Sequence, residues 1–335
     1  MTMDIFFGAE ARAYYEKSPL TLVDIGARGG LQPNWHAARR HLKMVGFEPD
    51  PAEYQRLAVK DPSGNTLYIN AALGRAPGRL LLNVGRLGGT SSLSTPNMDF
   101  LCRFPQPERY EVVKQVSIEA DALDNVLPRH GVNDPDFIKI DTQGAELAIL
   151  EGARDTVNRA IFGLEIEVLL APLYREQPTF GEIDSLLRGL GFQLFDLRPS
   201  YWKRAAGARY GGPKGQLAFA DVLYFRREDD VQRQLQAIDG AAARASKLMR
   251  MLAVSLLYGY VDYAIELFEP NRDLLEPRLA AEVDAALRSD IPVSARLPHF
   301  RGRGWLSHQF YRLHRAFFPT VGGWASGGRH IGNVE

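Results

Sequence analysis

Short apolar runs alternate with helix-like segments between about residue 20 and residue 226. Five of the runs are rich in leucine or β-branched residues, which is typical of strands in a buried sheet. They are Leu20 to Ile25, Lys43 to Phe47, Leu67 to Ile69, Phe137 to Ile140 and Ile161 to Val168. Because strands that alternate with helices form parallel sheets covered on both faces, we expect an α/β fold in which all five are buried central strands.

Two further apolar runs, Phe192 to Leu197 and Leu217 to Phe225, have no helical pattern between them. This spacing predicts an antiparallel hairpin that closes a mostly parallel, seven-stranded sheet. The pattern also leaves two long loops, Gly85 to Glu111 and Arg198 to Gln216. Loops of this length in a compact domain are commonly functional, so we expect substrate specificity to lie in them.

The pattern becomes helical beyond Arg226, with helices expected at Val231 to Leu252, Ala253 to Phe268 and Glu276 to Leu287. We therefore divide the chain into a helical lead-in at 1–19, a sheet domain at 20–227, and a helical region with a basic aromatic tail at 228–335. The longest apolar stretch, within the helical region, contains three charged residues that would be costly in hydrocarbon. It is interpreted as packed helix, and no transmembrane span is expected.

Composition narrows the classes of partner. The 335 residues contain 40 basic and 40 acidic side chains, so no overall field favours nucleic acid, and no nucleic-acid partner is expected. Cys102 is the only cysteine, which excludes an internal disulfide or a cysteine metal cluster. We find no signal-peptide pattern at residues 1–19 and expect a cytoplasmic protein. The sequence leaves the formation of a homo-oligomer open.

A glycine turn follows the first predicted strand. The segment Leu22 to Gly30 places Asp24 at the end of the strand and then supplies Gly26, Gly29 and Gly30. Glycine permits positive φ and lets a ligand approach the backbone closely. A helix expected to begin near Pro33 would direct its free N–H groups toward that ligand.

A second acid strengthens the prediction of a cofactor site. Glu48 closes the next strand about 20 residues after the turn, where a carboxylate that binds ribose hydroxyls belongs. Two such hydrogen bonds would contribute roughly 3 kcal/mol. The alternative is that Glu48 is an ordinary exposed side chain, but the paired spacing favours the cofactor.

A nicotinamide-dependent oxidoreductase would also show a glycine turn and a later acid. Three features favour S-adenosyl-L-methionine instead. Asp24 suits the ammonium group of a methionine, the glycines follow a G-x-x-G-G order, and the sheet ends in a hairpin. A third hypothesis is a non-catalytic binding module with the same fold.

The motifs resemble those of the FkbM-type methyltransferase family. The matching stretches are Val23 to Ala27, Gly46 to Asp50, Asn70 to Gly74, Thr90 to Leu93 and, most specifically, Ile138 to Glu146 followed by Leu150 to Ala153. The resemblance covers about residues 20–226, although family members often carry Asn where Arg28 stands. It implies a class I methyltransferase (Rossmann-like) fold, S-adenosyl-L-methionine as cofactor, and O-methylation of sugars or natural products.

The resemblance also implies that the first and fourth strands are neighbours, so that Asp24 and Asp141 flank one cleft. Ala71 and Ala72 would then lie near the adenine. The candidate cofactor-binding residues are Asp24, Gly26, Ala27, Arg28, Gly30, Glu48, Pro49, Asp50, Ala71, Ala72 and Asp141. We expect the acceptor to be a hydroxyl, of a sugar in a polysaccharide or of a glycosylated metabolite.

A carboxylate that takes the hydroxyl proton during transfer would contribute roughly 10²- to 10⁴-fold. Asp141 is the first candidate, with Glu146 next and then Glu165 or Glu167 on the fifth strand. Each has a structural alternative. Asp141 could cap the next helix, Glu146 could complement the helix dipole, and the two strand glutamates would need a partner such as Lys139. No metal is expected, although several carboxylates could hold Mg²⁺.

The segment from Arg296 to Glu335 combines six arginines and four histidines with a single acid. Aromatic residues are interleaved with these charges. Packing on the main domain is the default expectation for such a tail. Peripheral contact with a membrane is the alternative if the acceptor is a lipid-linked glycan. For the small residues at Gly88 to Ser92, closure over the cofactor or acceptor and a solvated turn are equally compatible with the sequence.

Overall fold

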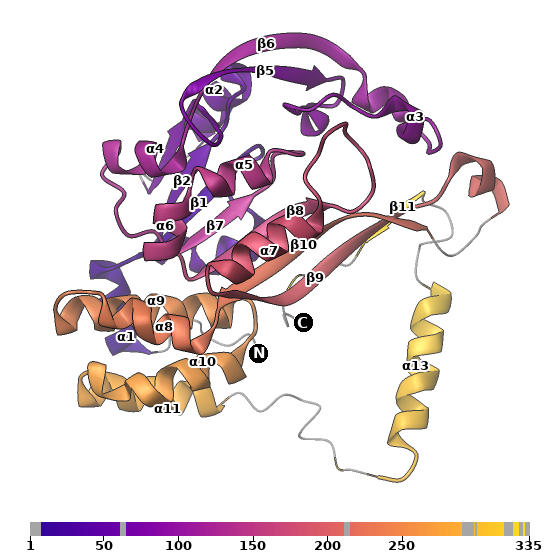
Figure 1. The fold of residues 1–335 in the computed structure, drawn as a ribbon. Coiled ribbons are helices and arrows are strands. Elements are labelled where there is room, and N and C mark those ends of the chain that lie inside the picture. The colour runs from indigo at the N-terminus through magenta and orange to yellow at the C-terminus, as the bar shows by residue number, and fades with distance from the viewer. Residues whose placement is uncertain are drawn as a thin grey trace.

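The computed structural model describes residues 8–60, 65–210, 215–289, 298, 300–317, 324–327 and 331. Its centre is an eight-stranded sheet in the order β11-β9-β10-β8-β7-β1-β2-β3 (Figure 1). The strands are β1 (Leu20–Ile25), β2 (Leu42–Phe47), β3 (Thr66–Ile69), β7 (Phe137–Ile140), β8 (Gly163–Leu169), β9 (Phe192–Trp202), β10 (Gln216–Arg226) and β11 (Ala325–Gly327). Strands β3, β2, β1, β7 and β8 run parallel, and β10 runs antiparallel to both of its neighbours, β8 and β9.

The seven predicted strands and the closing hairpin are confirmed, as is the class I methyltransferase order with β1 beside β7. Every residue of β7 and β8 is buried, which explains their almost continuous apolar sequence. Strand β3 differs because it lies at the edge of the sheet, where Leu67 is 38% exposed. The expectation of five central strands is therefore wrong for β3. Strand β11, from the tail, adds an eighth strand beside β9.

Alternate residues of the strands contribute to two apolar clusters, one on each face of the sheet. One face is covered by α4 (Leu123–Arg129), α5 (Glu146–Glu151), α6 (Arg154–Arg159) and α7 (Phe180–Gly189). The other is covered by α1 (Ala9–Lys17), η1 (Pro33–His41), α8 (Glu228–Gln236), α9 (Ala241–Leu257), α10 (Val261–Phe268) and α11 (Pro277–Ser289). The helix expected near Pro33 is thus a 3₁₀ helix, and α2 (Pro51–Lys60) follows β2.

The predicted helix from Val231 to Leu252 is wrong as one unit, because the chain turns between α8 and α9. Gly240 directly precedes α9 and has a φ of +86°. Residues other than glycine rarely adopt this conformation. Helix α9 then continues past the expected boundary to Leu257, and η5 (Glu269–Leu274) joins α10 to α11. Helices α8 to α11 share an apolar cluster with one face of the sheet. The domain boundary proposed near residue 228 stays a prediction.

A second, three-stranded sheet was not expected from the sequence. It consists of β4 (Ala72–Leu73), β5 (Gly78–Gly85) and β6 (Val112–Asp121) in the order β4-β6-β5, and it arches over the main sheet in Figure 1. The predicted loop Gly85 to Glu111 joins β5 to β6 and contains η2 (Gly88–Thr90), α3 (Met98–Leu101) and η3 (Pro107–Tyr110). The loop predicted at Arg198 to Gln216 is shorter than expected, because β9 continues to Trp202, and it contains η4 (Ala205–Tyr210).

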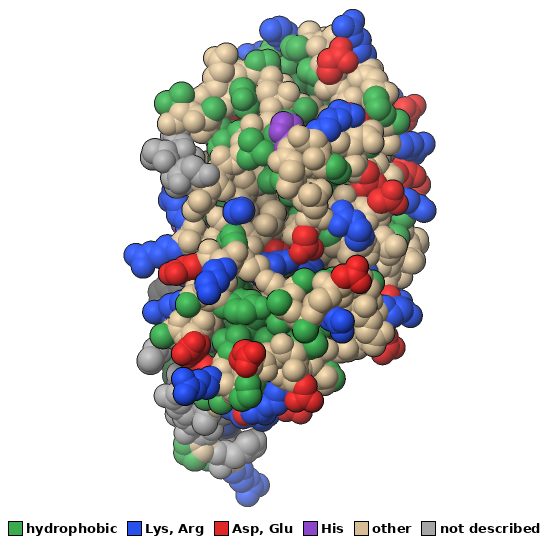
Figure 2. All heavy atoms as spheres, turned by 90° about the vertical axis from the view of Figure 1, so that its left-hand side faces the viewer, with side chains coloured by type: hydrophobic (Ala, Val, Ile, Leu, Met, Phe, Trp, Pro, Cys, Tyr) green, Lys and Arg blue, Asp and Glu red, His purple; other side chains and the backbone are tan. Residues whose placement is uncertain are grey.

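The described parts of the tail differ in how they contact the rest of the protein. Trp324 and β11 pack against β9, while α13 (Arg303–Phe317) exposes large apolar side chains and stands apart from α8 to α11 in Figure 1. Residues 290–297, 299, 318–323, 328–330 and 332–335 of the predicted tail region lie outside the described residues. No described helix is long and apolar enough to cross a membrane. Acidic and basic side chains are interspersed over the face shown in Figure 2.

Candidate active site

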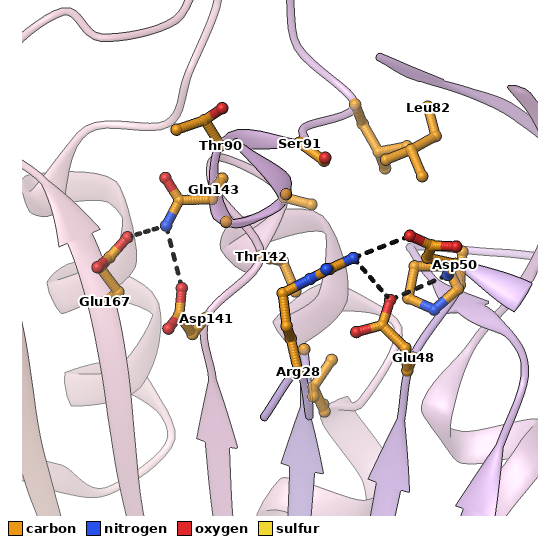
Figure 3. A pocket seen from close by; sticks show the side chains of 18 of the residues that line it. Arg28, Glu48, Asp50, Leu82, Thr90, Ser91, Asp141, Thr142, Gln143 and Glu167 are labelled. Atoms are coloured by element: carbon orange, nitrogen blue, oxygen red, sulfur yellow. Dashed lines mark hydrogen bonds and ion pairs between the residues drawn. The ribbon is translucent and has the colours of Figure 1, made fainter. Parts of the chain in front are cut away.

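A cavity of about 540 Å³ opens where β1, β2, β7 and β8 end. Loops after these strands form its floor, and the second sheet covers it with Leu82 and Val84 of β5 and Ile118 of β6. Ligands of open α/β sheets bind at this edge, between strands whose connections leave in opposite directions. Figure 3 shows the polar side chains that point into the cavity.

The glycine turn after β1 brings the first and fourth strands together. A Cβ on Gly26 would lie 2.0 Å from the carbonyl oxygen of Asp141, so that only glycine fits, and its φ is +85°. The N–H groups of Gly26 and Ala27 both donate to the carbonyl of Phe47, which fixes the turn on β2. Gly26 lines the cavity, whereas Ala27 is buried behind it and Gly30 faces a separate, smaller pocket.

Asp24 lies beneath this turn and does not line the cavity. It is 1% exposed, its Oδ1 has no hydrogen-bond partner, and the nearest cation is the ammonium of Lys139, 3.9 Å away. Burial raises the pKa of Asp24 to about 6, and this effect outweighs the attraction of Lys139. A buried carboxylate oxygen without a hydrogen-bond partner is unusual and indicates a functional role.

Glu48 stands at the end of β2 and faces the cavity. The N–H of Asp50 donates to its Oε1 at 2.9 Å, and burial raises its pKa. Arg28 lies across the same corner, 3.0 Å from Asp50 and 3.9 Å from Glu48. All three residues line the cavity with Pro49. The alternative of an exposed Glu48 is wrong, because only 4% of the residue is exposed.

The apolar side of the cavity lies beyond Glu48. Phe47, Ala71, Ala72 and Leu73 line it, together with the three residues of the second sheet. The N–H of Ala71 donates to the carbonyl of Ile69, which turns the chain directly after β3. Ala71 and Ala72 therefore form part of an apolar wall of the cavity.

The small residues from Gly88 to Ser92 close the cavity. Gly88, Gly89, Thr90 and Ser91 line it, and the Thr90 hydroxyl donates to the carbonyl of Arg109 at 2.8 Å. Ser92 is 1% exposed and donates to the carbonyl of Gln143. The Thr90 contact joins the segment to η3, and the Ser92 contact joins it to the loop after β7, so the segment forms part of the cavity wall.

Two carboxyl groups face each other across Gln143 (Figure 3). The Gln143 amide donates to Asp141 Oδ1 at 3.1 Å and to Glu167, and its carbonyl accepts from the Tyr174 hydroxyl at 3.3 Å. Gln143 has a φ of +59°, which is costly for a residue with a side chain and is commonly found at functional sites. Burial, followed by the charge of Asp141, raises the pKa of Glu167 well above its ordinary value.

The structure does not bring Glu146 or Glu165 to the cavity. Glu146 is 1% exposed, and it accepts hydrogen bonds from the N–H groups of Thr142 and Gly144, so it holds its own loop. Glu165 accepts from the hydroxyl of Tyr258 at 2.8 Å, beneath the C-terminal end of α9. Their geometry gives neither a route to a substrate hydroxyl. Asp141 also does not cap α5, which has no side-chain cap.

Several cavity residues were missed in the sequence. Gln143 lies within the most specific motif but was not assigned a role, and Glu167 was only an alternative to Glu165. Arg109 and Trp202 come from the two segments expected to determine specificity, but no local pattern marks them. Among the described residues, no group of three or more His, Cys, Asp or Glu is placed to hold a metal ion.

Comparison with known families decides the class of protein. The family model of the methyltransferase FkbM domain matches residues 24–194, which is half of the chain and includes the glycine turn, Glu48 and the loop after β7. The chain belongs to the FkbM methyltransferase family. S-adenosyl-L-methionine is the cofactor of this class of enzyme, and the nicotinamide alternative is set aside.

Individual relatives of this FkbM methyltransferase are distant. Methyltransferase sdnD of Sordaria araneosa is 26% identical over 196 residues, which are 52% of this chain and 73% of that protein. An FkbM methyltransferase of Methylobacillus flagellatus is 16% identical with a TM-score of 0.34, over 62% of this chain but only 44% of that one. Magnesium protoporphyrin IX methyltransferase of Synechocystis, solved with bound cofactor, is 11% identical with a TM-score of 0.33, over 65% and 77% of the two chains. Similarity this low supports no conclusion about substrate.

The residues present fit S-adenosyl-L-methionine. The cavity volume lies within the range of about 300 to 1,000 Å³ usual for small-molecule sites. The buried, unbonded oxygen of Asp24 lies below the cavity floor, and Gly26 leaves the space that a side chain would fill. Glu48 and the apolar wall at Ala71 and Ala72 complete an arrangement suited to a ribose and an adenine.

Proposed function

We propose that this FkbM methyltransferase transfers a methyl group to a hydroxyl, of a sugar in a polysaccharide or of a glycosylated metabolite. The observation that carries the proposal is the carboxylate of Asp141 in the cavity beside the glycine turn, held by Lys139 at 3.4 Å and by Gln143. Beyond Asp141 the cavity continues between Tyr110, Trp202 and Phe219. Aromatic faces next to carboxylates suit a sugar, which stacks its C–H groups and donates its hydroxyls.

In this proposal each part of the cavity binds one part of the cofactor. Glu48 accepts hydrogen bonds from the ribose hydroxyls, and Ala71 and Ala72 contact the adenine. Gly26 and Arg28 lie along the turn at the amino-acid end, with Asp24 below them. Asp50 holds Arg28 in place at 3.0 Å, so it acts on the cofactor through that arginine and through Glu48.

The chain must align the acceptor and manage one proton. When bound, the cofactor would supply a methyl group activated by a positively charged sulfur, which would keep the electron pair of the S–CH3 bond when the methyl group is transferred to the acceptor oxygen. Asp141 accepts the hydroxyl proton as that oxygen attacks, a contribution of roughly 10²- to 10⁴-fold. Burial raises the pKa of Glu167 and so favours its protonated form, and with Gln143 it holds the acceptor in line.

A panel of mono- and oligosaccharides, incubated with the cofactor, tests the proposed acceptor. We expect release of S-adenosyl-L-homocysteine together with a product whose mass rises by one methylene group and whose new bond survives alkali, as an ether does. A product cleaved by alkali would show transfer to a carboxyl group and contradict the proposal. Cofactor binding without transfer to any glycan or natural product would favour the non-catalytic reading.

Calorimetry with S-adenosyl-L-homocysteine tests the cofactor contacts separately. We expect Glu48→Ala to weaken binding about 100-fold, because two charge-assisted hydrogen bonds contribute roughly 3 kcal/mol. Glu119→Gln is the matched control, since Glu119 is a glutamate of β6 that pairs with Arg79 outside the cavity. Equal affinities of the two variants would contradict the assignment of Glu48.

A second proposal concerns α13, and its basis is the chemistry of one helix. Leu306, Phe310 and Leu313 follow a spacing of i, i+4 and i+7, and they are 39%, 62% and 54% exposed. The helix contains several arginines and histidines but no acid. A basic amphipathic helix suits a membrane surface with anionic lipids. We infer that α13 mediates peripheral contact with such a surface.

Point substitutions test this contact better than truncation, because truncation before α13 would also remove Trp324 and β11. We expect Phe310→Glu with Leu313→Glu to abolish sedimentation with vesicles that contain phosphatidylglycerol. Leu81→Glu is the control, because Leu81 is an exposed leucine of β5. Vesicle binding retained in the double variant, or equal binding to neutral phosphatidylcholine vesicles, would overturn the inference.

A further inference from the structure

The end of the cavity away from Glu48 contains an arginine enclosed by aromatic rings. The guanidinium carbon of Arg109, in η3, lies 4.3 Å from the ring centre of Trp324, 4.7 Å from that of Trp202 and 5.0 Å from that of Tyr110. These rings belong to segments far apart in the chain. The two tryptophans also contact each other edge-on at 5.4 Å. Arg109, Tyr110 and Trp202 line the cavity.

The backbone holds this group in place. The carbonyl of Arg109 accepts from the N–H of Leu87 at 3.1 Å and from the Thr90 hydroxyl, so the arginine is fixed to the segment that closes the cavity. The N–H of Lys203 donates to the carbonyl of Trp324 at 2.7 Å, which seats that ring beside the end of β9. Arg109 is therefore part of a built wall of the cavity.

Arg109 has no carboxylate partner among the residues that the structure describes. Its Nε is buried and has no hydrogen-bond partner, although the guanidinium interacts with the Tyr110 side chain. The neighbouring arginines differ, since Arg28 pairs with Asp50 and Arg198 pairs with Asp221. A buried donor left unpaired is unfavourable, so its presence at a cavity wall indicates a ligand group that completes it.

The rings restrict what that ligand group can be. Aromatic rings stabilise a guanidinium through its faces but do not neutralise its charge. The Nε–H at the edge of the guanidinium has no partner, and the edge N–H groups of a guanidinium match the two oxygens of a carboxylate or a phosphate. A neutral hydroxyl would satisfy one donor and leave the charge uncompensated. The geometry therefore favours an anion bound in the plane of the guanidinium.

We propose that Arg109 binds an anionic group of the acceptor, so that the methylated molecule carries a carboxylate or a phosphate besides its reacting hydroxyl. For a sugar acceptor, an assignment that rests on the proposed function, this means a uronic acid or a sugar phosphate. Asp141 and Glu167 lie at the strand ends of the same cavity. They hold the hydroxyl end, and the cage of Arg109, Tyr110, Trp202 and Trp324 holds the charged end.

Binding without turnover tests the proposal. Calorimetry and tryptophan fluorescence, to which Trp202 and Trp324 contribute, are measured on the full chain saturated with S-adenosyl-L-homocysteine. The probes are methyl glucuronide, glucose 6-phosphate and methyl glucoside as the neutral reference. We expect one of the two anionic sugars to bind at least about tenfold more tightly than the glucoside, as a charge-assisted bidentate contact predicts. Which anion is preferred identifies the group.

Substitution of Arg109 separates this contact from folding. We expect Arg109→Met to remove the preference for the anion while binding of the glucoside and of S-adenosyl-L-homocysteine stays within about twofold. Arg109→Lys retains the charge but not the planar fork, so it should restore only part of the preference. Arg103→Met is the matched control, because Arg103 is an exposed arginine of the same loop whose guanidinium lies over Phe100.

Two results would overturn the proposal. One is wild-type protein that binds the glucoside as tightly as both anionic sugars, and the other is Arg109→Met that weakens every probe equally. A separate probe, 4-hydroxybenzoate, distinguishes this failure from failure of the sugar assignment. Binding of 4-hydroxybenzoate that depends on Arg109, with no sugar bound, would support the anion contact and refute a sugar acceptor.

Discussion

The two ends of strand β7 bury charge in opposite ways. At its amino end, Asp136 accepts hydrogen bonds from Lys247 at 2.8 Å and Arg250 at 2.9 Å, both on α9, and from the N–H of Thr21. Asp134 completes a set of two acids and two bases. Burial raises the pKa of Asp136, but the two cations outweigh it, so the pKa lies below its ordinary value.

At the carboxyl end of β7 the acids outnumber the bases. Six carboxyl groups lie at or near this end with two cations, and burial is the largest cause of a raised pKa in five of the six. The acids are Asp24, Asp141, Glu146, Glu165, Glu167 and Asp221, and the cations are Lys139 and Arg198. Balanced buried charge joins α9 to the sheet, whereas unbalanced buried charge lies at the cavity, where a positively charged cofactor is expected.

Replacement of Asp141 should give the largest functional effect. We expect Asp141→Asn to lower kcat roughly 10²- to 10⁴-fold, because the amide cannot accept the hydroxyl proton. Affinity for S-adenosyl-L-homocysteine and the thermal midpoint should change little, since Gln143 and the amide can still form a hydrogen bond. Single-turnover kinetics with saturating cofactor would measure the loss. A kcat within threefold of wild type would show that another group takes the proton.

Replacement of Asp136 should give the largest structural effect. We expect Asp136→Asn to lower the free energy of unfolding by about 3 to 5 kcal/mol, because it leaves two buried cations without full compensation. Urea denaturation followed by circular dichroism measures this loss. Asp134→Asn is the control, since that side chain is 51% exposed, and it should cost less than about 1 kcal/mol. Similar small losses in both variants would contradict the contrast between the two ends.

The pH dependence of stability should have opposite signs at the two ends. The raised pKa of Asp24 means that the folded state binds more protons than the unfolded state between about pH 4 and pH 6. Stability from a protonated Asp24 is therefore lost as the pH rises through 6, by about 3 kcal/mol. The lowered pKa of Asp136 gives stability above about pH 4 that is lost as the pH falls.

Unfolding free energies measured from pH 3 to pH 8 would test these signs. The stability of Asp24→Asn relative to wild type should rise between pH 4 and pH 6, and the deficit of Asp136→Asn should shrink toward pH 3. Parallel curves for the two variants would contradict the assigned pKa directions.

Replacement of Glu167 should have the smallest effect among these four predictions. Because its raised pKa favours the protonated form of Glu167, Glu167→Gln retains a donor of similar shape. We expect kcat to fall less than about tenfold, well below the loss in Asp141→Asn. Initial rates at pH 7 would measure the ratio of the two variants. A greater loss in Glu167→Gln would reverse the roles of the two acids.

The sequence predicted the main sheet because its inner strands are buried on both faces. Strands β1 and β7 have the expected bounds, and the order that places them side by side followed from the family resemblance. Strands β5 and β6 were missed because the covering sheet is half exposed and its residues alternate in burial. The alternation of Val116, Ile118 and Ala120 with polar residues was a usable signal of period two.

The candidate site was harder to predict, because the direction in which each side chain points matters more there than the residue type. Glu165 and Glu167 share a face of β8, as their spacing requires, but Tyr258 from a distant helix covers the first and leaves the second at the cavity. Glu146 turns back because two N–H groups of its own loop need an acceptor. The cage around Arg109 depends on rings from three separate segments, and no sequence pattern relates them.

Strand β11 has a consequence for the order in which the site is assembled. Trp202 ends β9, and Trp324, which packs on it, is synthesised 122 residues later. The glycine turn, Glu48 and the loop after β7 are all present long before. Since chains are synthesised from the N-terminus, the residues proposed to hold the methyl donor are made before the last ring of the cage around Arg109. The cage proposed to bind the acceptor is therefore among the last parts of the cavity to be completed during synthesis.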